Sequence, residues 1–304
     1  MEMARESVTD PIDQTLVATP VAAVGCFRLS TSHPAFKTFG AISRHWVAFP
    51  RRAVWIGRPD HQPFVADATR ATLYNPGDEY WRAPIDRAGD HADLFAVAPS
   101  VLRDALQNVD PAAADRENDL FTRPFAPIRS DIYLRQRVLF EYVQSTPDPD
   151  LLYVEEAVVN LVADAATADA DEAGAAHAPV RQARQFDMAE ATCALLNRHY
   201  RTSLALSDIA SALGVSVFHL CRLFRRFTGS TIHQHREHLR LRASLAAILE
   251  TDADLLSIGM SLGYSSHSHF TRAFRRRFQM TPSELRQTKK AGRVDAERQP
   301  IRAS

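Results

Sequence analysis

The chain has 304 residues, of which 45% are hydrophobic and 24% are charged, and this composition is typical of a globular protein rather than a disordered or fibrous one. The formal net charge is zero, but residues 1–179 carry 16 Lys and Arg against 26 Asp and Glu, hence −10, whereas residues 180–304 carry 20 against 10, hence +10. The length is sufficient for two domains, and the charge split predicts that the basic half meets a polyanion; an uneven surface charge without function is the alternative.

The N-terminus and the cysteines indicate a cytoplasmic protein. Residues 1–16 contain no apolar core of a secretion signal, and no stretch reaches the ~20 apolar residues that a membrane helix needs. Cys26, Cys193 and Cys221 lie far apart and form no CxxC pair, which argues against a disulfide scaffold or a zinc site. We expect free thiols, buried or partly buried, in a reducing compartment.

Short apolar segments separated by Pro, Gly and Asp predict a β-rich domain between residues 21 and 125. They are rich in β-branched and aromatic residues, as in a small antiparallel barrel or sandwich, and cover residues 22–29, 46–49, 53–56, 64–66, 71–74 and 94–97. The sequence Asn75-Pro76-Gly77-Asp78 predicts a turn, because Pro fixes φ and Gly accepts a positive φ. One short helix is expected at residues 99–109.

A helical hairpin follows the β-rich domain. Residues 130–145 and 151–166 each place apolar side chains along one helix face, and Pro147-Asp148-Pro149 separates them. The hairpin has two candidate roles, which one segment can combine: it covers the open side of the barrel, or it forms the contact between two chains. Residues 166–180 lack periodicity and consist mostly of Ala, Asp and Glu, so they are predicted to form a linker.

Two similar stretches dominate the basic part of the chain, which shows no strand signal beyond residue 181. After a helix at residues 187–200, residues 209–227 and 258–278 repeat the same pattern at an offset of 49 to 50 positions. In each, an apolar helix ends at a glycine, Gly214 or Gly263, and a serine is placed to cap a second helix. The caps are Ser216 in the first repeat and Ser265 or Ser266 in the second. This pattern predicts two helix-turn-helix units; a plain helical hairpin is the alternative for either copy alone.

The second helix of each unit has an inward stripe and an outward face. The stripes are Leu220, Leu223, Phe224 and Phe227 in the first unit, and Phe270, Phe274 and Phe278 in the second. The side chains on the opposite face of each second helix are then predicted to lie exposed, where they can reach a DNA groove. They are Phe218, Cys221 and Arg222 in the first unit, and His267, Ser268, Thr271 and Arg272 in the second. We assign phosphate contacts to the arginines near the helix C-termini and to the capping hydroxyls, namely Ser216, Arg225, Arg226, Thr231, Ser266, Arg275, Arg276 and Thr281.

A long helix is predicted to join the two units. Thr231 with Gln234, and Thr281 with Glu284, fit capping boxes 50 residues apart. The first box opens a helix over residues 232–250, which at 1.5 Å per residue is roughly 28 Å long. A rod of this length can hold two reading helices about one DNA turn apart, on the order of 34 Å.

Residues 187–287 resemble the DNA-binding domain of AraC/XylS-type transcriptional regulators. The second repeat carries the match, through Ile258, Gly263, Tyr264, Ser266, Ser268, Phe270, Arg272, Phe274, Arg275, Phe278, Thr281, Pro282 and Arg286. Gly259, Gln279 and Leu285 depart from the family's usual Ala, Gly and Tyr, at packing and turn positions. The resemblance implies base reading by Phe218, Cys221 and Arg222 in the first repeat and by His267, Ser268, Thr271 and Arg272 in the second. Readout in the first repeat then relies on contact with thymine methyl groups and on Arg222.

The N-terminal half is similar, more weakly, to the cupin-like sensor domains of that family, around residues 71–80. A metal-binding cupin needs a His-x-His pair followed by a Glu and a further His; His33, His45, His61 and His91 lack that spacing, so no metal or other cofactor is expected. A small-molecule pocket lined by Trp46, Trp55, Tyr74, Tyr80, Trp81 and Arg82 is one interpretation of the aromatic residues, and a packed core is the other.

These observations predict an α+β protein. Residues 17–165 form a cupin-like antiparallel β barrel with a helical hairpin, 166–180 a linker, and 181–290 an all-α domain with two helix-turn-helix motifs joined by a long helix. The predicted function is sequence-specific transcription regulation in response to a small-molecule effector, by a homodimer without catalytic or membrane-binding activity. Its partners would be double-stranded DNA and RNA polymerase. A cupin-type metalloenzyme with a fused DNA-binding tail and an effector-independent DNA-binding adaptor are the alternatives.

Overall fold

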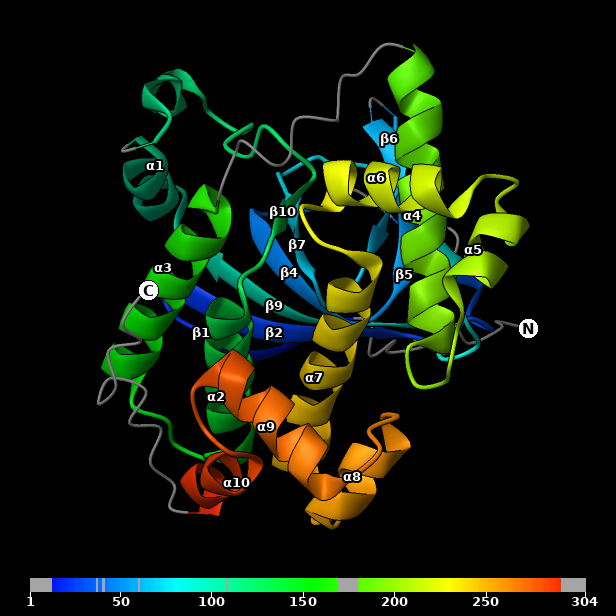
Figure 1. The fold of residues 1–304 in the computed structure, drawn as a ribbon. Helices are drawn as coiled ribbons and strands as arrows, with labels where there is room; N and C mark the ends of the chain where they lie inside the picture. The colour runs from blue at the N-terminus through cyan, green and yellow to red at the C-terminus, as the bar shows by residue number, and fades with distance from the viewer. Residues whose placement is uncertain are drawn as a thin grey trace, which may run out of the picture.

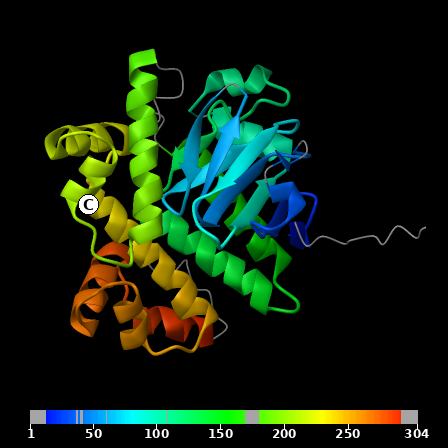
Figure 2. The same cartoon turned by 90° about the vertical axis from the view of Figure 1, so that its right-hand side faces the viewer.

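The fold is α+β, with antiparallel sheets in the first half of the chain and helices in the second (Figure 1). A computed structural model describes residues 13–36, 38–39, 42–59, 61–107, 109–168 and 180–290. Figure 2 shows the sheets on one side and the helices from α4 onward on the other. Within the described residues there are two sheets and ten α-helices.

The strands form one sheet of six and one of four, and every pairing is antiparallel. The first sheet has the order β1 (Asp13–Ala18), β2 (Ala22–Leu29), β9 (Asp90–Val97), β4 (Trp46–Arg52), β7 (Arg70–Tyr74), β10 (Phe125–Pro127). The second has the order β3 (Thr38–Phe39), β8 (Tyr80–Pro84), β5 (Val54–Arg58), β6 (His61–Ala66). The strand pairing shows two separate sheets, so closure into a barrel and the cupin-like topology stay predictions.

All six apolar segments predicted as strands coincide with strands, and β2 has the predicted bounds. The predicted turn is present: Gly77 has φ +87°, and the Asp78 backbone N–H donates to the Asn75 carbonyl (3.2 Å). The Asp78 carboxylate in turn accepts from the Asn75 N–H (2.9 Å). The periodicity did not predict β1, β3 and β10, which lie at sheet edges, nor β8, which lies between β3 and β5. Ala48, Ile56 and Phe64 belong to an apolar cluster formed by residues of both sheets.

The helical hairpin covers the six-stranded sheet. After α1 (Pro99–Gln107), the hairpin consists of α2 (Ser130–Ser145) and α3 (Leu151–Thr167), close to the predicted bounds. Helix α3 packs on β2, β9, β4 and β10 through Val154, Val158 and Leu161, which are almost fully buried. Helix α2 lies between α3 and the C-terminal helices α7 and α9. The hairpin thus covers one face of the six-stranded sheet, whereas the barrel that it was predicted to close and a contact between two chains stay predictions.

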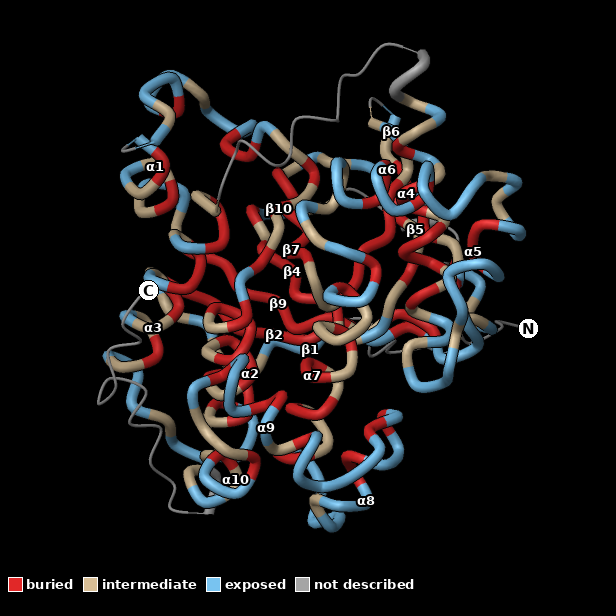
Figure 3. The backbone as a smooth tube through the Cα atoms, in the orientation of Figure 1, coloured by how far each residue is buried: buried red, intermediate tan, exposed pale blue. Residues whose placement is uncertain are grey.

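The C-terminal half is helical. Its elements are α4 (Val180–His199), α5 (Leu206–Ala212), α6 (Val217–Thr228), α7 (Ile232–Glu250), α8 (Leu255–Ser261), α9 (His267–Phe278) and α10 (Pro282–Lys290). Helix α4 begins earlier than the predicted residue 187, and most of the predicted linker lies outside the described residues. The strands and the inner faces of the hairpin helices form the buried interior, whereas α5, α8 and α9 are exposed on their outward faces (Figure 3).

The two halves of the chain share one apolar core. A single buried cluster extends from Phe49 and Phe95 of the six-stranded sheet, through the hairpin, to Leu245 of α7 and Phe274 of α9. Each Å² of apolar surface that is removed from water stabilises the folded state by roughly 25 cal/mol. The helices that carry the two repeats are therefore packed against the sheet domain, an arrangement that local sequence patterns do not predict.

Buried ion pairs also join the halves. The guanidinium of Arg70 on β7 lies 2.8 Å from the carboxylate of Glu190 on α4, which also accepts from the Val65 backbone N–H (2.7 Å). Arg137 of α2 contacts both Asp93 of β9 and Glu250 at the end of α7. Removal of one partner from a buried pair leaves an uncompensated charge, so these contacts hold the two halves in a defined relation.

Candidate nucleic-acid interface

The first predicted helix-turn-helix unit is formed by α5 and α6, between which the chain bends by 88°. Gly214 in the turn has φ +67°, a conformation that L side chains rarely adopt, as predicted. The Ser216 hydroxyl accepts from the His219 backbone N–H (3.2 Å) and caps α6. Leu220 and Phe224 of the predicted stripe are fully buried, and so the opposite side of α6 faces outward.

The second unit, α8 and α9, repeats this geometry. Gly263 in the turn has φ +85°, and Ser266 rather than Ser265 caps α9 by accepting from the His269 backbone N–H (3.1 Å). Phe270 and Phe274 are fully buried, and their rings pack edge to face at a centroid distance of 5.8 Å. The structure thus builds the same unit twice, as the sequence repeat predicts.

The helix α7 joins the two units with the predicted bounds. Its capping box is complete: the Thr231 hydroxyl accepts from the Gln234 backbone N–H (3.2 Å), and the Gln234 side chain accepts from the Thr231 N–H (2.9 Å). Thr281 and Glu284 make the equivalent pair of bonds at α10 (3.2 and 2.6 Å). The hydrogen bond from the Thr281 backbone N–H to the Glu284 carboxylate, followed by that from the Thr281 hydroxyl, lowers the pKa of the Glu284 carboxyl.

Six of the seven predicted base-reading side chains belong to exposed residues. They are Phe218, Cys221 and Arg222 on α6, and His267, Ser268 and Arg272 on α9. Phe218 is 76% exposed, which is unusual for a phenylalanine and leaves its ring free to meet another surface. Thr271 differs, because it is half-buried and its hydroxyl oxygen is shielded from solvent. The prediction that Thr271 lies exposed was wrong, since it sits at the edge of the stripe that packs inward.

The predicted phosphate-binding arginines lie on the same two helices. Arg225 and Arg226 near the end of α6, and Arg275 and Arg276 near the end of α9, are all exposed. Arg276 has a competing partner, because it lies 3.1 Å from the Glu237 carboxylate of α7. Each of the four capping hydroxyls accepts a hydrogen bond from a backbone N–H in the first turn of its helix. These hydroxyls belong to Ser216, Ser266, Thr231 and Thr281.

The helices α6 and α9 end in the same backbone conformation but with different residue types at the equivalent position. Gly229 ends α6 with φ +68°, and its N–H donates to the Arg225 carbonyl (3.0 Å). Gln279 ends α9 with φ +58°, and its N–H donates to the Arg275 carbonyl (2.9 Å). Among the residues that the structure describes, Gln279 is the only one other than glycine with a positive φ. The departure from the usual glycine therefore places a strained residue at the end of α9.

The cysteines differ in accessibility. Cys26 and Cys193 are buried, and burial raises the pKa of the Cys193 thiol well above its usual value. Cys221 is exposed on the outward side of α6. The prediction of three buried or partly buried thiols was therefore wrong for this residue, whereas its predicted place on the exposed face of the helix is confirmed.

The six residues predicted to line an effector pocket do not converge on one cavity. Trp46, Tyr74 and Tyr80 line a space between the sheets of only about 50 Å³. Trp55 packs toward the cluster that includes α4, and Trp81, which is 42% exposed, lies against Gly57 on the outer side of the second sheet. Arg82 is buried and 3.4 Å from Asp90. Ligand pockets usually enclose about 300–1,000 Å³, so the space between the sheets is too small for a ligand in this conformation.

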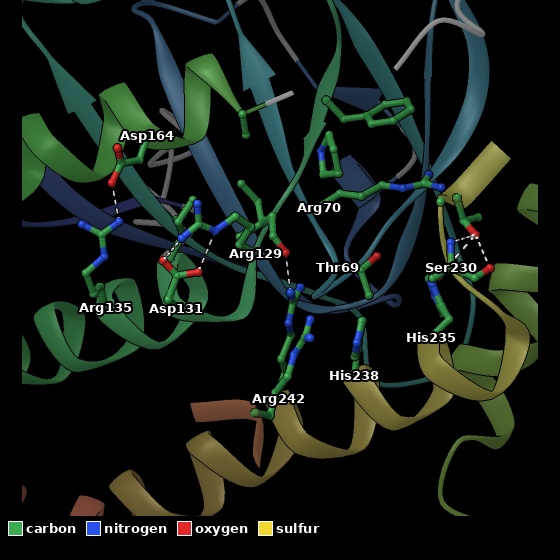
Figure 4. Close-up of a pocket in the computed structure, with 18 of the residues that line it drawn as sticks. Thr69, Arg70, Arg129, Asp131, Arg135, Asp164, Ser230, His235, His238 and Arg242 are labelled. Atoms are coloured by element: carbon green, nitrogen blue, oxygen red, sulfur yellow. Dashed lines mark hydrogen bonds and ion pairs between the residues drawn. The ribbon is translucent and has the colours of Figure 1, made fainter. Parts of the chain in front are cut away.

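A larger polar cavity, which the sequence patterns did not predict, lies where the two halves meet (Figure 4). Its lining comes from β7, the start of α2, the end of α3, the α6–α7 turn, α7 and α9, with a volume of about 550 Å³. These segments are up to 208 positions apart, so no spacing rule could have assembled them. The only local signal is the row His235, His238 and Arg242, which share one face of α7.

Among the described residues, no cluster of three or more His, Cys, Asp or Glu side chains has the geometry to hold a metal ion. In that part of the chain, no single helix has the length and apolar content required to cross a membrane.

The helical repeats are similar to the DNA-binding regions of known proteins. The model of a helix-turn-helix domain matches residues 209–288. The regulatory protein SoxS of Escherichia coli is 33% identical over 93 residues, which are 31% of this chain and 87% of SoxS. The chain belongs to the AraC/XylS family of transcription regulators. The probable transcription factor PqrA of Proteus vulgaris gives a similar match, 33% identical over 84 residues, covering 28% of this AraC-family chain and 69% of PqrA.

Solved structures also align with this AraC-family regulator. An AraC-type regulator from Chromobacterium violaceum is 29% identical and covers 34% of the chain and 92% of its own length, with a TM-score of 0.33. ToxT from Vibrio cholerae is 12% identical and covers 88% of the chain and 98% of its own length, with a TM-score of 0.34. The assignment to the AraC family rests on the sequence relatives, which concern the helix-turn-helix region alone.

Proposed function

We propose that this AraC-family regulator recognises a specific DNA site through α6 and α9, and that its N-terminal half responds to a small molecule in the cytoplasm. DNA-binding transcription regulation follows from the family. The repeated helix-turn-helix geometry, with exposed polar and aromatic side chains on the outward faces of α6 and α9, is the observation that supports the assignment of base-reading residues.

The two reading helices are unequal in this proposal. Arg222 is the strongest hydrogen-bond donor on the α6 face, where Phe218 and Cys221 suit contact with thymine methyl groups. The α9 face carries Arg272 and His267, as well as the small hydroxyl of Ser268. An arginine can bond both guanine acceptors in the major groove, so Arg222 and Arg272 contribute most of the hydrogen-bonded specificity. Thr271, being half-buried, contributes little.

Phosphate contacts position the two helices. Arg225, Arg226 and Arg275 are exposed and have no carboxylate partner among the ion pairs of the described residues, so they can meet the DNA backbone directly. The ion pair between Arg276 and Glu237 must break before Arg276 can contact a phosphate. A single chain would then engage two successive major grooves, because α7 holds α6 and α9 at its two ends.

Selection of bound DNA from a random pool, followed by affinity measurements, tests base reading. Arg272→Ala is expected to cost about 1–3 kcal/mol on the selected site and to relax specificity at one base pair. Arg226→Ala is the matched control: it should weaken binding to all sequences and flatten the salt dependence. Unchanged site selection in the double variant Arg222→Ala/Arg272→Ala would contradict direct readout by these residues.

The proposed regulator acts as a homodimer and contacts RNA polymerase. Leu151 and Leu152 at the start of α3 are 51% and 75% exposed, which supports a contact between chains through the hairpin. Leu152→Glu should then lower the fraction of dimer in sedimentation analysis without changing the unfolding midpoint of the monomer. A monomeric wild-type protein at all concentrations would exclude this part of the proposal.

A further inference from the structure

The cavity between the two halves is a candidate ligand site by its size and position. Its volume of about 550 Å³ lies within the range of about 300–1,000 Å³ that is usual for small-molecule pockets. One wall belongs to the sheet domain and the hairpin, and the other to the helices that carry the two repeats. A molecule bound here would contact both parts of the regulator at once.

The lining of the cavity is strongly cationic. Five arginines, Arg70, Arg129, Arg135, Arg242 and Arg277, face two aspartates, Asp131 and Asp164. Three of the arginines have carboxylate partners: Arg70 with Glu190 (2.8 Å), Arg129 with Asp131 (2.7 Å), and Arg135 with Asp164. None of the ion pairs between described residues includes Arg242 or Arg277. Two positive charges in this wall are therefore unmatched.

Arg242 is the less usual of the two, because it is only 2% exposed. Its guanidinium donates to the backbone carbonyls of Ala68 and Ile128, and its buried Nε has no acceptor. Desolvation lowers the pKa of Arg242 to about 10, as expected for a buried cation whose hydrogen-bond partners are neutral. A buried charge without a counter-charge is costly, and an anion beside it would remove that cost.

Arg277 and His238 complete the donor set. The Arg277 Nε donates to the Ser130 hydroxyl (2.5 Å), and desolvation is the main cause that lowers the pKa of this guanidinium. His238 lies four residues before Arg242 on the same face of α7, and Figure 4 shows both side chains rising from that helix toward the sheet domain. Desolvation, followed by the nearby arginines, lowers the pKa of His238 to about 3, so its imidazole is neutral at pH 7 and still donates one hydrogen bond.

We infer that this cavity binds a small oxyanion-bearing metabolite, whose carboxylate or phosphate group is held by Arg242 and Arg277 and hydrogen-bonded by His238. This inference deepens the proposed function, since it names the chemical class and the place of the effector. Arginine suits this role because its planar guanidinium presents parallel N–H donors to two oxygens of such a group. A DNA phosphate cannot be held by both arginines, because a bulky duplex can reach Arg277, which is exposed, but cannot reach the guanidinium of Arg242, which is 2% exposed.

The position of the cavity explains how such a ligand would regulate DNA binding. Arg242 lies on α7, which joins the two helix-turn-helix units, and Arg277 lies on the reading helix α9. Both contact the start of α2 through Ile128 and Ser130. An anion that attracts these two arginines competes with their contacts to the sheet domain, and so changes how α7 and α9 are held.

The test uses the full chain without DNA. Sodium phosphate and sodium citrate are titrated separately at constant ionic strength, maintained with sodium chloride, while heat of binding and the thermal unfolding midpoint are recorded. Saturable binding of at least one of the two anions is expected, and the comparison shows whether the cavity prefers phosphate or carboxylate. The absence of saturable binding by both would overturn the inference.

Two variants locate the binding site. Arg277→Gln removes one unmatched cation without emptying the buried position of Arg242, and it should weaken anion binding at least about tenfold, as expected for loss of a charged hydrogen bond. Arg242→Gln should do the same, provided that its unfolding midpoint without anion shows that it folds. Equal anion affinity in wild type and Arg277→Gln would overturn the inference.

The double variant Arg225→Gln/Arg275→Gln is the matched control. It removes two exposed arginines of the DNA-facing helices, so it should keep the anion affinity of the wild type and lose DNA affinity. Loss of anion binding in this variant would place the anion on the DNA-facing surface instead of the cavity. Failure of the proposed function would appear separately, as a wild-type protein that binds phosphate or citrate but selects no DNA sequence.

Discussion

The end of α9 offers a sharp test of the repeat, because Gln279 occupies a position where the first unit has Gly229. Both residues have a left-handed backbone, with φ +58° and +68°, and both N–H groups close the last turn of their helix. We expect Gln279→Gly to stabilise the protein and the reciprocal change Gly229→Gln to destabilise it. The two substitutions exchange the same residue types at equivalent sites, so each is the control for the other.

Two opposing contributions determine the change in the free energy of unfolding on Gln279→Gly. A left-handed conformation costs roughly 1–2 kcal/mol for a residue with a Cβ, and Gln279→Gly removes that cost. Glycine gives the unfolded chain more freedom, which offsets about 0.4–1 kcal/mol of the gain. The Gln279 side chain donates to the Arg276 carbonyl (3.0 Å), but this bond is exposed to water and adds little. The net change is about 0.5–1 kcal/mol in favour of the folded state.

Urea unfolding followed by circular dichroism measures this change as a shift of midpoint at constant slope. In thermal unfolding the same gain raises the midpoint by about 1–3 °C. Gly229→Gln should lower both midpoints by a similar amount. The reasoning would be refuted if Gln279→Gly destabilised the protein, or if the two variants shifted the midpoint in the same direction.

A thiol, a buried ion pair and a helix cap provide three further tests. A maleimide should label the exposed Cys221 in the folded protein much faster than the buried Cys193, and selected DNA should slow the labelling of Cys221. Mass spectrometry measures both labelling rates. Equal labelling of Cys221 with and without DNA would contradict the assignment of α6 as a reading helix. Glu190→Ala leaves Arg70 buried without a counter-charge, so the free energy of unfolding should fall by about 3–5 kcal/mol, whereas a loss below about 1 kcal/mol would mean that water reaches this pair. Ser266→Ala removes the cap of α9 and should cost about 1 kcal/mol of stability in urea unfolding, with no change expected if the hydroxyl bond to the His269 N–H were absent.

Local signals in the sequence predicted the elements that carry function. A glycine in each turn, a serine or threonine at each cap and an apolar residue at every third or fourth position act within a few residues, so the bounds of α2 and α7 could be predicted. The same signals predicted which side chains of α6 face outward. They failed at Thr271, because the edge of a helix stripe is decided by how closely the neighbouring helices approach.

The six strand segments were predictable for the same reason, whereas the arrangement of the sheets was not. Whether ten strands close into a barrel depends on pairings between distant residues, such as Ala22 with Val97 and Val54 with Pro84, which composition does not encode. The aromatic residues that the sequence grouped as one pocket therefore ended on different sides of the second sheet, with Trp46 inside and Trp81 outside.

The sequence alone determined that this chain carries two helix-turn-helix units with an arginine-rich surface, since a repeat with matching turn, cap and core positions has few other physical solutions. Only the tertiary structure decided how those units are held against the sheet domain. The pairs Arg70–Glu190 and Arg137–Glu250, and the contact of Arg242 with the Ile128 carbonyl, join residues that are 113 to 120 positions apart. Such contacts arise from the packing of whole elements, because a charged side chain is buried only where another part of the chain comes to cover it.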